Sequence, residues 1–169
     1  MKKHTELVIF SLGSNLGDRR SYLEQGLNSL IRELGREVNV SPIYETPPLG
    51  FDAETTFYNC AVSIRTNKSP LEILRIIQLI EKESNRKRTE GSANYESRTL
   101  DIDIIYYGDK LFKSEELTIP HANRLNRKFV LQPICDIHSA FIDPIEQKTI
   151  NELLSAVNDE SELKKIGVF

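Results

Sequence analysis

The amino-acid sequence predicts an α+β fold, a ferredoxin-like sandwich with the element order β-α-β-β-α-β. Short runs rich in β-branched and aromatic residues alternate with two segments of helical periodicity, and this alternation gives the predicted order. We expect a mainly antiparallel sheet flanked by helices, with additional strands and one helix near the C-terminus. The chain has 169 residues, which suffices for one domain with one core, so residues 1–169 are expected to form a single domain.

The strands are predicted from apolar runs that are bounded by turn residues. The four main strands are expected at residues 7–10, 38–45, 57–65 and 98–107. Pro42 lies within the second of these and implies an edge position or a bulge there. Two shorter strands are expected around residues 117–119 and 129–131.

The helices are predicted from start signals followed by a repeating apolar stripe. Asp18 is a candidate cap for the first helix, and Gly35 lies where a C-terminal glycine belongs. A second helix begins at a capping box of Ser69 and Glu72, and a late helix begins at a similar box starting at Thr149. The expected stripes are Leu23, Leu27, Leu30 and Leu34; Ile73, Ile77 and Ile80; and Leu153, Leu154 and Val157.

Charge and composition exclude several classes of function. Lysine and arginine number 22 against 25 acidic residues, a net charge of −3, which does not favour binding to nucleic acid or to an anionic membrane. The longest stretch without a formal charge has 11 residues, whereas a membrane-spanning helix needs about 20. Cys60 and Cys135 lack the spacing of a zinc site and suit a reducing compartment, so we expect a cytoplasmic protein.

Asp101 and Asp103 are the first candidates for chemistry. In the expected strand, Leu100, Ile102, Ile104 and Tyr106 face a core, and Thr99, Asp101 and Asp103 face the other way. Two carboxylates on one strand face repel each other unless a cation lies between them. Mg²⁺ binds carboxylate oxygens and substrate phosphates together. A solvated strand face, with each Asp paired to a nearby Arg, is the open alternative.

The segment before this strand carries several cations that would suit a polyphosphate. They are Arg86, Lys87, Arg88 and Arg98. Cations that complement the dipole at a helix C-terminus are the alternative for residues 86–88, but this alternative does not explain Arg98. His121 and Arg127, in an irregular segment, are by themselves more often structural.

Aromatic and amide side chains could form a slot for a flat heterocycle. Phe57 and Asn59 share one face of their expected strand, as do Phe129 and Leu131 of theirs. On these residues alone, core aromatics and a turn-capping asparagine are the favoured interpretation. The sequence contains no P-loop and no Gly-x-Gly-x-x-Gly motif.

Four motifs in order resemble the 6-hydroxymethyl-7,8-dihydropterin pyrophosphokinase family of folate biosynthesis. They are Gly-Ser-Asn-Leu-Gly-Asp at residues 13–18, Tyr-Glu-Thr-Pro-Pro-Leu-Gly at 44–50, Arg-Thr-Leu-Asp-Ile-Asp at 98–103, and Pro-His at 120–121 followed by Arg-Lys-Phe-Val-Leu at 127–131. The resemblance extends roughly from Leu7 to Val157. It implies that the pyrophosphoryl group of ATP is transferred to the pterin hydroxymethyl group with release of AMP.

The resemblance also implies roles for individual residues. Two Mg²⁺ ions would be held by Asp101 and Asp103, which would be catalytic together with Arg86 and Arg98. The ATP site would comprise Gln78, Glu81, Arg86, Arg88, Arg98, Ile104, Thr118, His121 and Arg127. The pterin slot would comprise Thr46, Pro47, Leu49, Phe57, Asn59 and Phe129, with the ring between the two phenylalanines. A monomer that binds only these small molecules is expected.

The sequence departs from the family pattern at three places. Tyr95-Glu96-Ser97 replaces the usual Trp-Gly-Pro before Arg98, Ala122 replaces a larger residue, and Glu116 stands where a basic residue can occur. Two other classes also stay open. A two-metal nucleotidyltransferase or phosphodiesterase uses Gly-Ser and Asp-x-Asp within one short unit, but here 86 residues lie between Ser14 and Asp101. A non-catalytic ligand-sensing module would not need the two aspartates and two arginines together.

Overall fold

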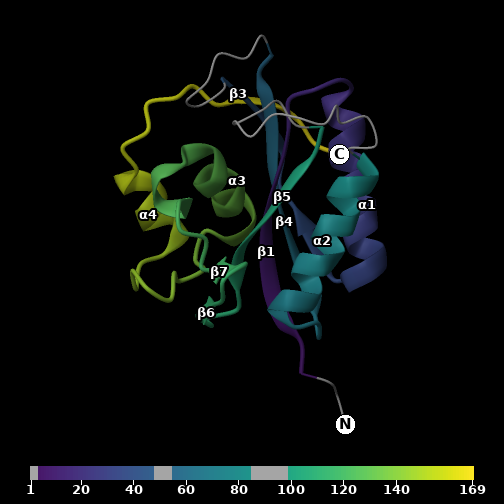
Figure 1. The fold of residues 1–169 in the computed structure, drawn as a ribbon. Helices are drawn as coiled ribbons and strands as arrows, with labels where there is room; N and C mark the ends of the chain where they lie inside the picture. Colours follow the sequence, from purple (N-terminus) through teal and green to yellow (C-terminus); the bar gives the residue numbers. More distant parts are fainter. Residues whose placement is uncertain (1–3, 48–54, 85–98) are drawn as a thin grey trace.

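The computed structural model describes residues 4–47, 55–84 and 99–169. A sheet, seen edge-on in Figure 1, lies between the helix pair α1 and α2 and the helix pair α3 and α4. The elements are β1 (Glu6–Ser14), α1 (Arg19–Leu34), β2 (Val38–Val40), β3 (Ile43–Thr46), β4 (Phe57–Thr66), α2 (Pro70–Ser84), β5 (Asp101–Tyr107), β6 (Phe112–Lys113), β7 (Thr118–Ile119), the 3₁₀ helix η1 (Arg124–Asn126), α3 (Lys128–His138), α4 (Ile150–Ala156) and β8 (Lys164–Gly167).

The sheet has the strand arrangement of the predicted α+β sandwich. Its order is β5-β1-β4-β3-β8, and β2 also pairs with β4. Every pairing in it is antiparallel, with β1 between β4 and β5. The first helix therefore connects β1 to strands that lie beyond β4, which is the split arrangement of a ferredoxin-like fold. The C-terminal β8 extends the sheet at β3, as expected of an added strand.

Each face of the sheet has its own hydrophobic core. Phe10, Leu12 and Ile102 pack with the leucines of α1 and the isoleucines of α2. Ile9 and Ala61 lie on the opposite face and pack with apolar residues of α3 and α4. Because successive strand residues point to opposite faces, β1 contributes to both cores in alternation. The second face is polar toward one end, where Asp101 and Asp103 lie.

The predicted starts of three helices, and the end of the first at Gly35, are confirmed. Asp18 caps α1 by accepting the backbone N–H of Ser21 at 3.0 Å, and Gly35 follows the helix with a φ of 144°. The capping boxes at Ser69 and Thr149 also form, each with the glutamate three residues later. Among the described residues, no helix is both long enough and apolar enough to cross a lipid bilayer.

The predicted strand at residues 38–45 is in fact two strands. It breaks at Ser41 and Pro42, between β2 and β3. Ser41 stays attached to the sheet because its hydroxyl accepts the backbone N–H of Ala61 at 2.8 Å and its own N–H donates to the carbonyl of Ala61 at 2.9 Å. The proline ring removes a backbone donor, so the chain pairs differently on its two sides.

The prediction of a strand at residues 129–131 is wrong, because these residues lie in helix α3. Val130, Leu131 and Ile134 form the buried stripe of this helix. The backbone N–H of Lys128, in the first turn, donates to the carboxylate of Asp159 at 2.9 Å. A three-residue apolar run does not distinguish a strand from a helix by its periodicity, and the sequence pattern was therefore ambiguous here.

The predicted alternation in β5 fails at its end. Ile9 pairs with Tyr106, but Phe10 pairs with Ile104, so Ile105 is an extra residue in a β-bulge. Ile105 and Tyr106 consequently both belong to the core under α3 and α4, whereas Leu100, Ile102 and Ile104 belong to the other core. The prediction that Tyr106 shares a face with Ile104 is wrong, while the predicted face of Asp101 and Asp103 is unaffected.

Candidate active site

Asp101 and Asp103 lie on one face of β5, at the edge of the sheet. Asp101 pairs with Gly13 of β1, and Asp103 pairs with Ser11. The bulge lies beyond Ile104, so the regular pairing of this end of the strand is kept. Both aspartates are partly exposed. The strand thus presents two carboxylates side by side on the face that α3 and α4 partly cover.

Residues predicted for the pterin slot share this face. Asn59 of β4 is buried and donates its side-chain N–H to the hydroxyl of Thr46 at 2.8 Å. Phe57 pairs with Thr46 across β3 and β4, so its side chain points to the same side as theirs. Phe129 packs against the core on this face from α3. Pro47 follows β3 and is exposed, while Leu49 lies outside the described residues.

Gly13 separates the two groups of residues and was not predicted as part of the site. It pairs with Asn59 on one side and with Asp101 on the other. A Cβ atom on Gly13 would lie only 3.0 Å from the side-chain oxygen of Asn59. The sequence showed Gly13 as a turn residue and as part of a family motif, and neither pattern indicated that it lies inside the sheet.

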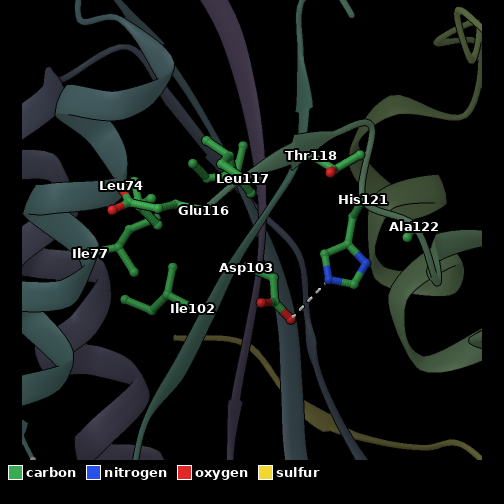
Figure 2. A pocket seen from close by; sticks show the side chains of 10 residues that line it. Leu74, Ile77, Ile102, Asp103, Glu116, Leu117, Thr118, His121 and Ala122 are labelled. Atoms are coloured by element: carbon green, nitrogen blue, oxygen red, sulfur yellow. Dashed lines mark ion pairs between the residues drawn. The ribbon is translucent and has the colours of Figure 1, made fainter. Parts of the chain in front are cut away.

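A pocket of about 240 Å³ opens next to Asp103 between α2 and the segment that follows β7. Figure 2 shows the side chains that line it. Its lining is Leu74, Ile77, Ile102, Asp103, Ile104, Glu116, Leu117, Thr118, His121 and Ala122. Of the residues predicted for ATP, it therefore contains Ile104, Thr118 and His121. The side toward α2 is mainly apolar but includes Glu116, and the other side carries the Asp103 carboxylate and the His121 imidazole.

His121 points toward Asp103, as Figure 2 shows, with Nε2 3.9 Å from the carboxylate oxygen. Its Nδ1 accepts the backbone N–H of Asn123 at 3.2 Å, so the neutral ring carries its proton on Nε2. Burial lowers the pKa of His121, and Arg127 lowers it further, although Asp103 and Asp101 act in the opposite direction. The ring is therefore neutral near pH 7 and directs an N–H donor into the pocket.

A buried ion pair supports the segment that carries His121. Arg124 donates to both carboxylate oxygens of Asp143, at 2.6 and 3.0 Å, and to the carbonyl of His121 at 3.1 Å. The hydroxyl of Tyr106 donates to the same carboxylate at 2.7 Å. Burial alone would raise the pKa of Asp143, but Arg124, two backbone N–H groups and Tyr106 bring it to about 2. Neither Arg124 nor Asp143 carried a signal in the sequence.

Glu81 and Gln78 were both predicted to belong to the ATP site. Both lie on α2, but they make different hydrogen bonds in the structure. The carboxylate of Glu81 accepts the backbone N–H of Ile102 at 2.8 Å. Gln78 is exposed and accepts from Arg75 at 3.2 Å. Arg75 also pairs with Glu116 at 2.8 Å, so the acidic residue at a position that can be basic attracts a cation from α2.

Arg127 lies at the start of α3, and its guanidinium carbon is 5.8 Å from the ring centre of Phe129. It is close enough to His121 to influence the charge of that ring. Arg86, Arg88 and Arg98 lie outside the described residues, as does the Tyr-Glu-Ser segment at 95–97. The described structure thus brings together the two aspartates, His121, Arg127 and most of the predicted pterin slot.

The fold and this site define a class: a small α+β protein with two carboxylates beside a pocket on one sheet face. Residues 9–139 match the family described as 7,8-dihydro-6-hydroxymethylpterin-pyrophosphokinase (HPPK). The chain belongs to the HPPK family. The predicted family is therefore confirmed, and no comparison favours a nucleotidyltransferase, a phosphodiesterase or a sensing module.

Several relatives carry the family's name. A 2-amino-4-hydroxy-6-hydroxymethyldihydropteridine pyrophosphokinase of Porphyromonas gingivalis is 39% identical over 132 residues, covering 78% of this chain and 90% of that protein. The Bacillus subtilis protein of the same name is 38% identical, covering 78% of this chain and 77% of that protein. The folic acid synthesis protein fol1 of Pneumocystis carinii is 34% identical over 91% of this chain, which spans only 20% of its length.

Solved structures show the same fold. The Plasmodium falciparum HPPK-DHPS wild type with pterin and p-hydroxybenzoate superposes with a TM-score of 0.70 at 20% identity. The superposition covers 91% of this chain and 43% of the Plasmodium chain. This likeness supports the α+β assignment, and the superposition covers less than half of the Plasmodium chain.

Proposed function

We propose that the chain transfers the pyrophosphoryl group of ATP to the hydroxymethyl group of 6-hydroxymethyl-7,8-dihydropterin and releases AMP. The hydroxymethyl oxygen forms a bond to the β-phosphorus, and the bond from that phosphorus to the oxygen of the α-phosphate breaks. The hydroxyl proton is released to solvent, and AMP leaves with the bridging oxygen. The observation that carries this proposal is the placement of the Asp101–Asp103 pair, beside a pocket, on the same sheet face as Asn59 and Thr46.

The polar floor made by Asn59 and Thr46 supports a pterin slot. Asn59 is held by its hydrogen bond to Thr46, so the edge of a flat ring would meet a fixed amide rather than a mobile one. Phe57 and Phe129 would stack on the two faces of that ring, with Pro47 and Leu49 completing the slot. Helix α3 supports this role for Phe129 as well as a strand would, because it approaches the same sheet face.

The pocket supports a nucleotide site. Its mainly apolar side suits a base, and Thr118 and Ile104 lie at its wall. The N–H of Ile104 points away from β1, as that of Ile102 does, because the backbone direction repeats every two residues. His121 would donate from Nε2 to a phosphate oxygen, and Arg127, Arg86, Arg88 and Arg98 would supply positive charge. The family resemblance also implies that Gln78 and Glu81 belong to the ATP site.

The donors at the site fit Mg²⁺. Asp101 and Asp103 offer carboxylate oxygens on one face, next to the pocket end that would hold phosphates, and hard cations prefer such ligands. They would hold two ions, which when bound would neutralise developing charge on the transferred group. In this proposal, strand β5 holds Asp101 toward the pterin slot and Asp103 toward His121. Arg86 and Arg98 would complete the catalytic group.

One reaction tests the function. The purified chain is incubated with ATP, Mg²⁺ and 6-hydroxymethyl-7,8-dihydropterin, and the nucleotide products are separated. AMP that forms only when the pterin is present, with an equal amount of pterin pyrophosphate, supports the proposal. ADP in place of AMP, or AMP that forms without pterin, contradicts it. An Asp101→Asn variant serves as the inactive control for contaminating enzymes.

The remaining expectations complete the proposal. Residues 1–169 would act as a single catalytic domain, as a monomer and in the cytoplasm, where ATP and reduced pterins are available. Size-exclusion chromatography with light scattering tests the monomer. A shift to a dimer at the concentrations used for activity would contradict that part of the proposal without affecting the reaction.

A further inference from the structure

Strand β5 carries both aspartates, yet it lies at the edge of the described sheet. It pairs with β1 on one side only. Ile102, between Asp101 and Asp103, directs its backbone N–H away from β1. An edge N–H without a strand partner loses a hydrogen bond unless something else accepts it. The carboxylate of Glu81 accepts it at 2.8 Å from the last turns of α2.

We propose that Glu81 is a positioning residue that fixes the direction of Asp101 and Asp103 by holding the backbone between them. Its acceptor oxygen takes the place of a missing neighbouring strand. The proposal rests on the proposed function, since it concerns the same pair of carboxylates. It assigns to Glu81 a role through β5 rather than the direct contact with ATP that the family resemblance implies.

Other contacts make this attachment firm. The hydroxyl of Thr99, just before β5, donates to the carbonyl of Ser84 at the end of α2 at 3.4 Å. Ile77 and Ile80 of α2 are buried in the same core as Ile102. Glu81 therefore extends from a helix that is already packed against β5. A small rotation of the strand about this attachment would turn both aspartates, because they flank the held residue.

Glu81 could instead act through its negative charge, and the experiment must distinguish this effect from positioning of β5. A third carboxylate close to the pair could act by its negative charge alone, attracting cations to the site. Positioning needs only an acceptor oxygen in the right place. Glu81→Gln keeps an acceptor oxygen and removes the charge, whereas Glu81→Ala removes both. Glu83→Ala is the matched control, because Glu83 is an exposed acid on the same helix.

The first measurement is hydrogen exchange of the Ile102 amide in the protein without ligands, followed by NMR. Exchange in Glu81→Ala should be about tenfold faster than in the parent chain, because one hydrogen bond of this amide is lost. Glu81→Gln and Glu83→Ala should exchange as the parent does. Unchanged exchange in Glu81→Ala would overturn the proposal, whatever the enzyme assays show.

The second measurement is the dependence of turnover on Mg²⁺. In Glu81→Ala, turnover or apparent Mg²⁺ affinity should fall about 10- to 100-fold, the usual effect of losing a residue that orients a metal ligand. The KM for the pterin should change less than about twofold, since the slot does not depend on Glu81. Glu81→Gln should lose much less than Glu81→Ala, because it keeps an acceptor oxygen for the Ile102 N–H. Melting temperatures of all variants identify any that fail to fold.

Three further results would overturn the positioning role. Equal losses in Glu81→Gln and Glu81→Ala would show that charge or a direct contact matters instead. Faster exchange with full turnover would make the hydrogen bond merely structural. A loss of the same size in Glu83→Ala would point to a general effect of helix charge. If the parent chain forms no AMP, the proposed function fails, while the exchange comparison still decides whether Glu81 holds β5.

Discussion

Asn59 and Asp101 lie in one row across three strands, with only Gly13 between them. Because strands in a sheet are about 4.8 Å apart, the two residues are separated by roughly 10 Å along this row. The amide would face the pterin and the carboxylate would face the phosphates. The missing side chain of Gly13 leaves the floor open between them, so both substrates could lie on one surface. In this proposal, the sheet therefore holds the groups that contact the two substrates at fixed positions relative to each other.

The carboxylate pair gives the most direct test. Asp101→Asn and Asp103→Asn should each lower kcat by about 100-fold or more, because charge neutralisation is most of phosphoryl-transfer catalysis. Their melting temperatures should stay unchanged or rise slightly, since each change removes a like-charge neighbour. AMP release and thermal unfolding are measured on the same samples, with exposed Asp109→Asn as the control. A lower melting temperature with retained activity would instead indicate a structural pair.

Phe129 tests the pterin slot on the helix side. Phe129→Ala should weaken pterin binding by about 1–3 kcal/mol, the usual range for losing a buried aromatic contact. ATP binding should change much less, because Phe129 does not line the pocket. Titration calorimetry with each ligand separately makes the comparison. Unchanged pterin affinity would remove Phe129 from the slot.

The Gly13→Ala variant tests whether the position between Asn59 and Asp101 must lack a side chain. Gly13→Ala places a methyl group about as close to Asn59 as atoms can approach, 3.0 Å from its side-chain oxygen. Asn59 must then shift, and its hydrogen bond to Thr46 must change with it. The KM for the pterin should rise about tenfold, as a displaced polar contact in a binding site typically costs, while the protein remains folded. A normal KM would mean that the row tolerates a side chain.

His121 should be neutral at physiological pH. Its pKa is lowered mainly by burial, so the ring gains a proton only below the usual range near 6.5. The sign follows from linkage: a histidine with a lowered pKa contributes stability above its unfolded pKa, and that contribution is lost as pH falls through the folded value. NMR titration of the ring protons in the ligand-free protein checks it. A pKa above that of a free histidine would contradict the burial argument.

The lowered pKa of Asp143 predicts the pH range in which acid begins to unfold the protein. Its folded pKa of about 2 lies below the ordinary value of 3.8, so it stabilises the fold above pH 3.8 and loses this contribution as pH falls toward 2. The contribution is roughly 2 kcal/mol. Denaturant unfolding across this range should show the loss, and Asp143→Asn should abolish it.

The same variant has a second, separate cost. At neutral pH, Asp143→Asn leaves Arg124 buried without its carboxylate partner, which should lower the free energy of unfolding by about 3–5 kcal/mol. Asp109 is exposed, so Asp109→Asn should change neither the acid profile nor the free energy of unfolding at neutral pH. An unchanged acid profile in Asp143→Asn would show that other carboxylates control acid unfolding.

The core order β-α-β-β-α-β, the helix caps and the face shared by Asp101 and Asp103 could be read from the sequence. These features depend on neighbours: a cap needs residues three apart, and a strand face needs residues two apart. The family resemblance could be recognised for a similar reason, since each of its motifs is made of residues adjacent in the sequence. The sequence therefore names most of the residues that the described structure brings together at the candidate site, and their roles stay predictions.

Contacts between distant residues needed the tertiary structure. The bulge at Ile105 turns Tyr106 to the other core because β1 and β5 must pair in one register. Residues 129–131 form a helix because Val130, Leu131 and Ile134 then cover the second sheet face. The pairs Arg124–Asp143 and Glu81–Ile102 join residues 19 and 21 positions apart. No local pattern encodes such pairs, since only packing of complete elements brings their polar groups into the interior, where they must be satisfied.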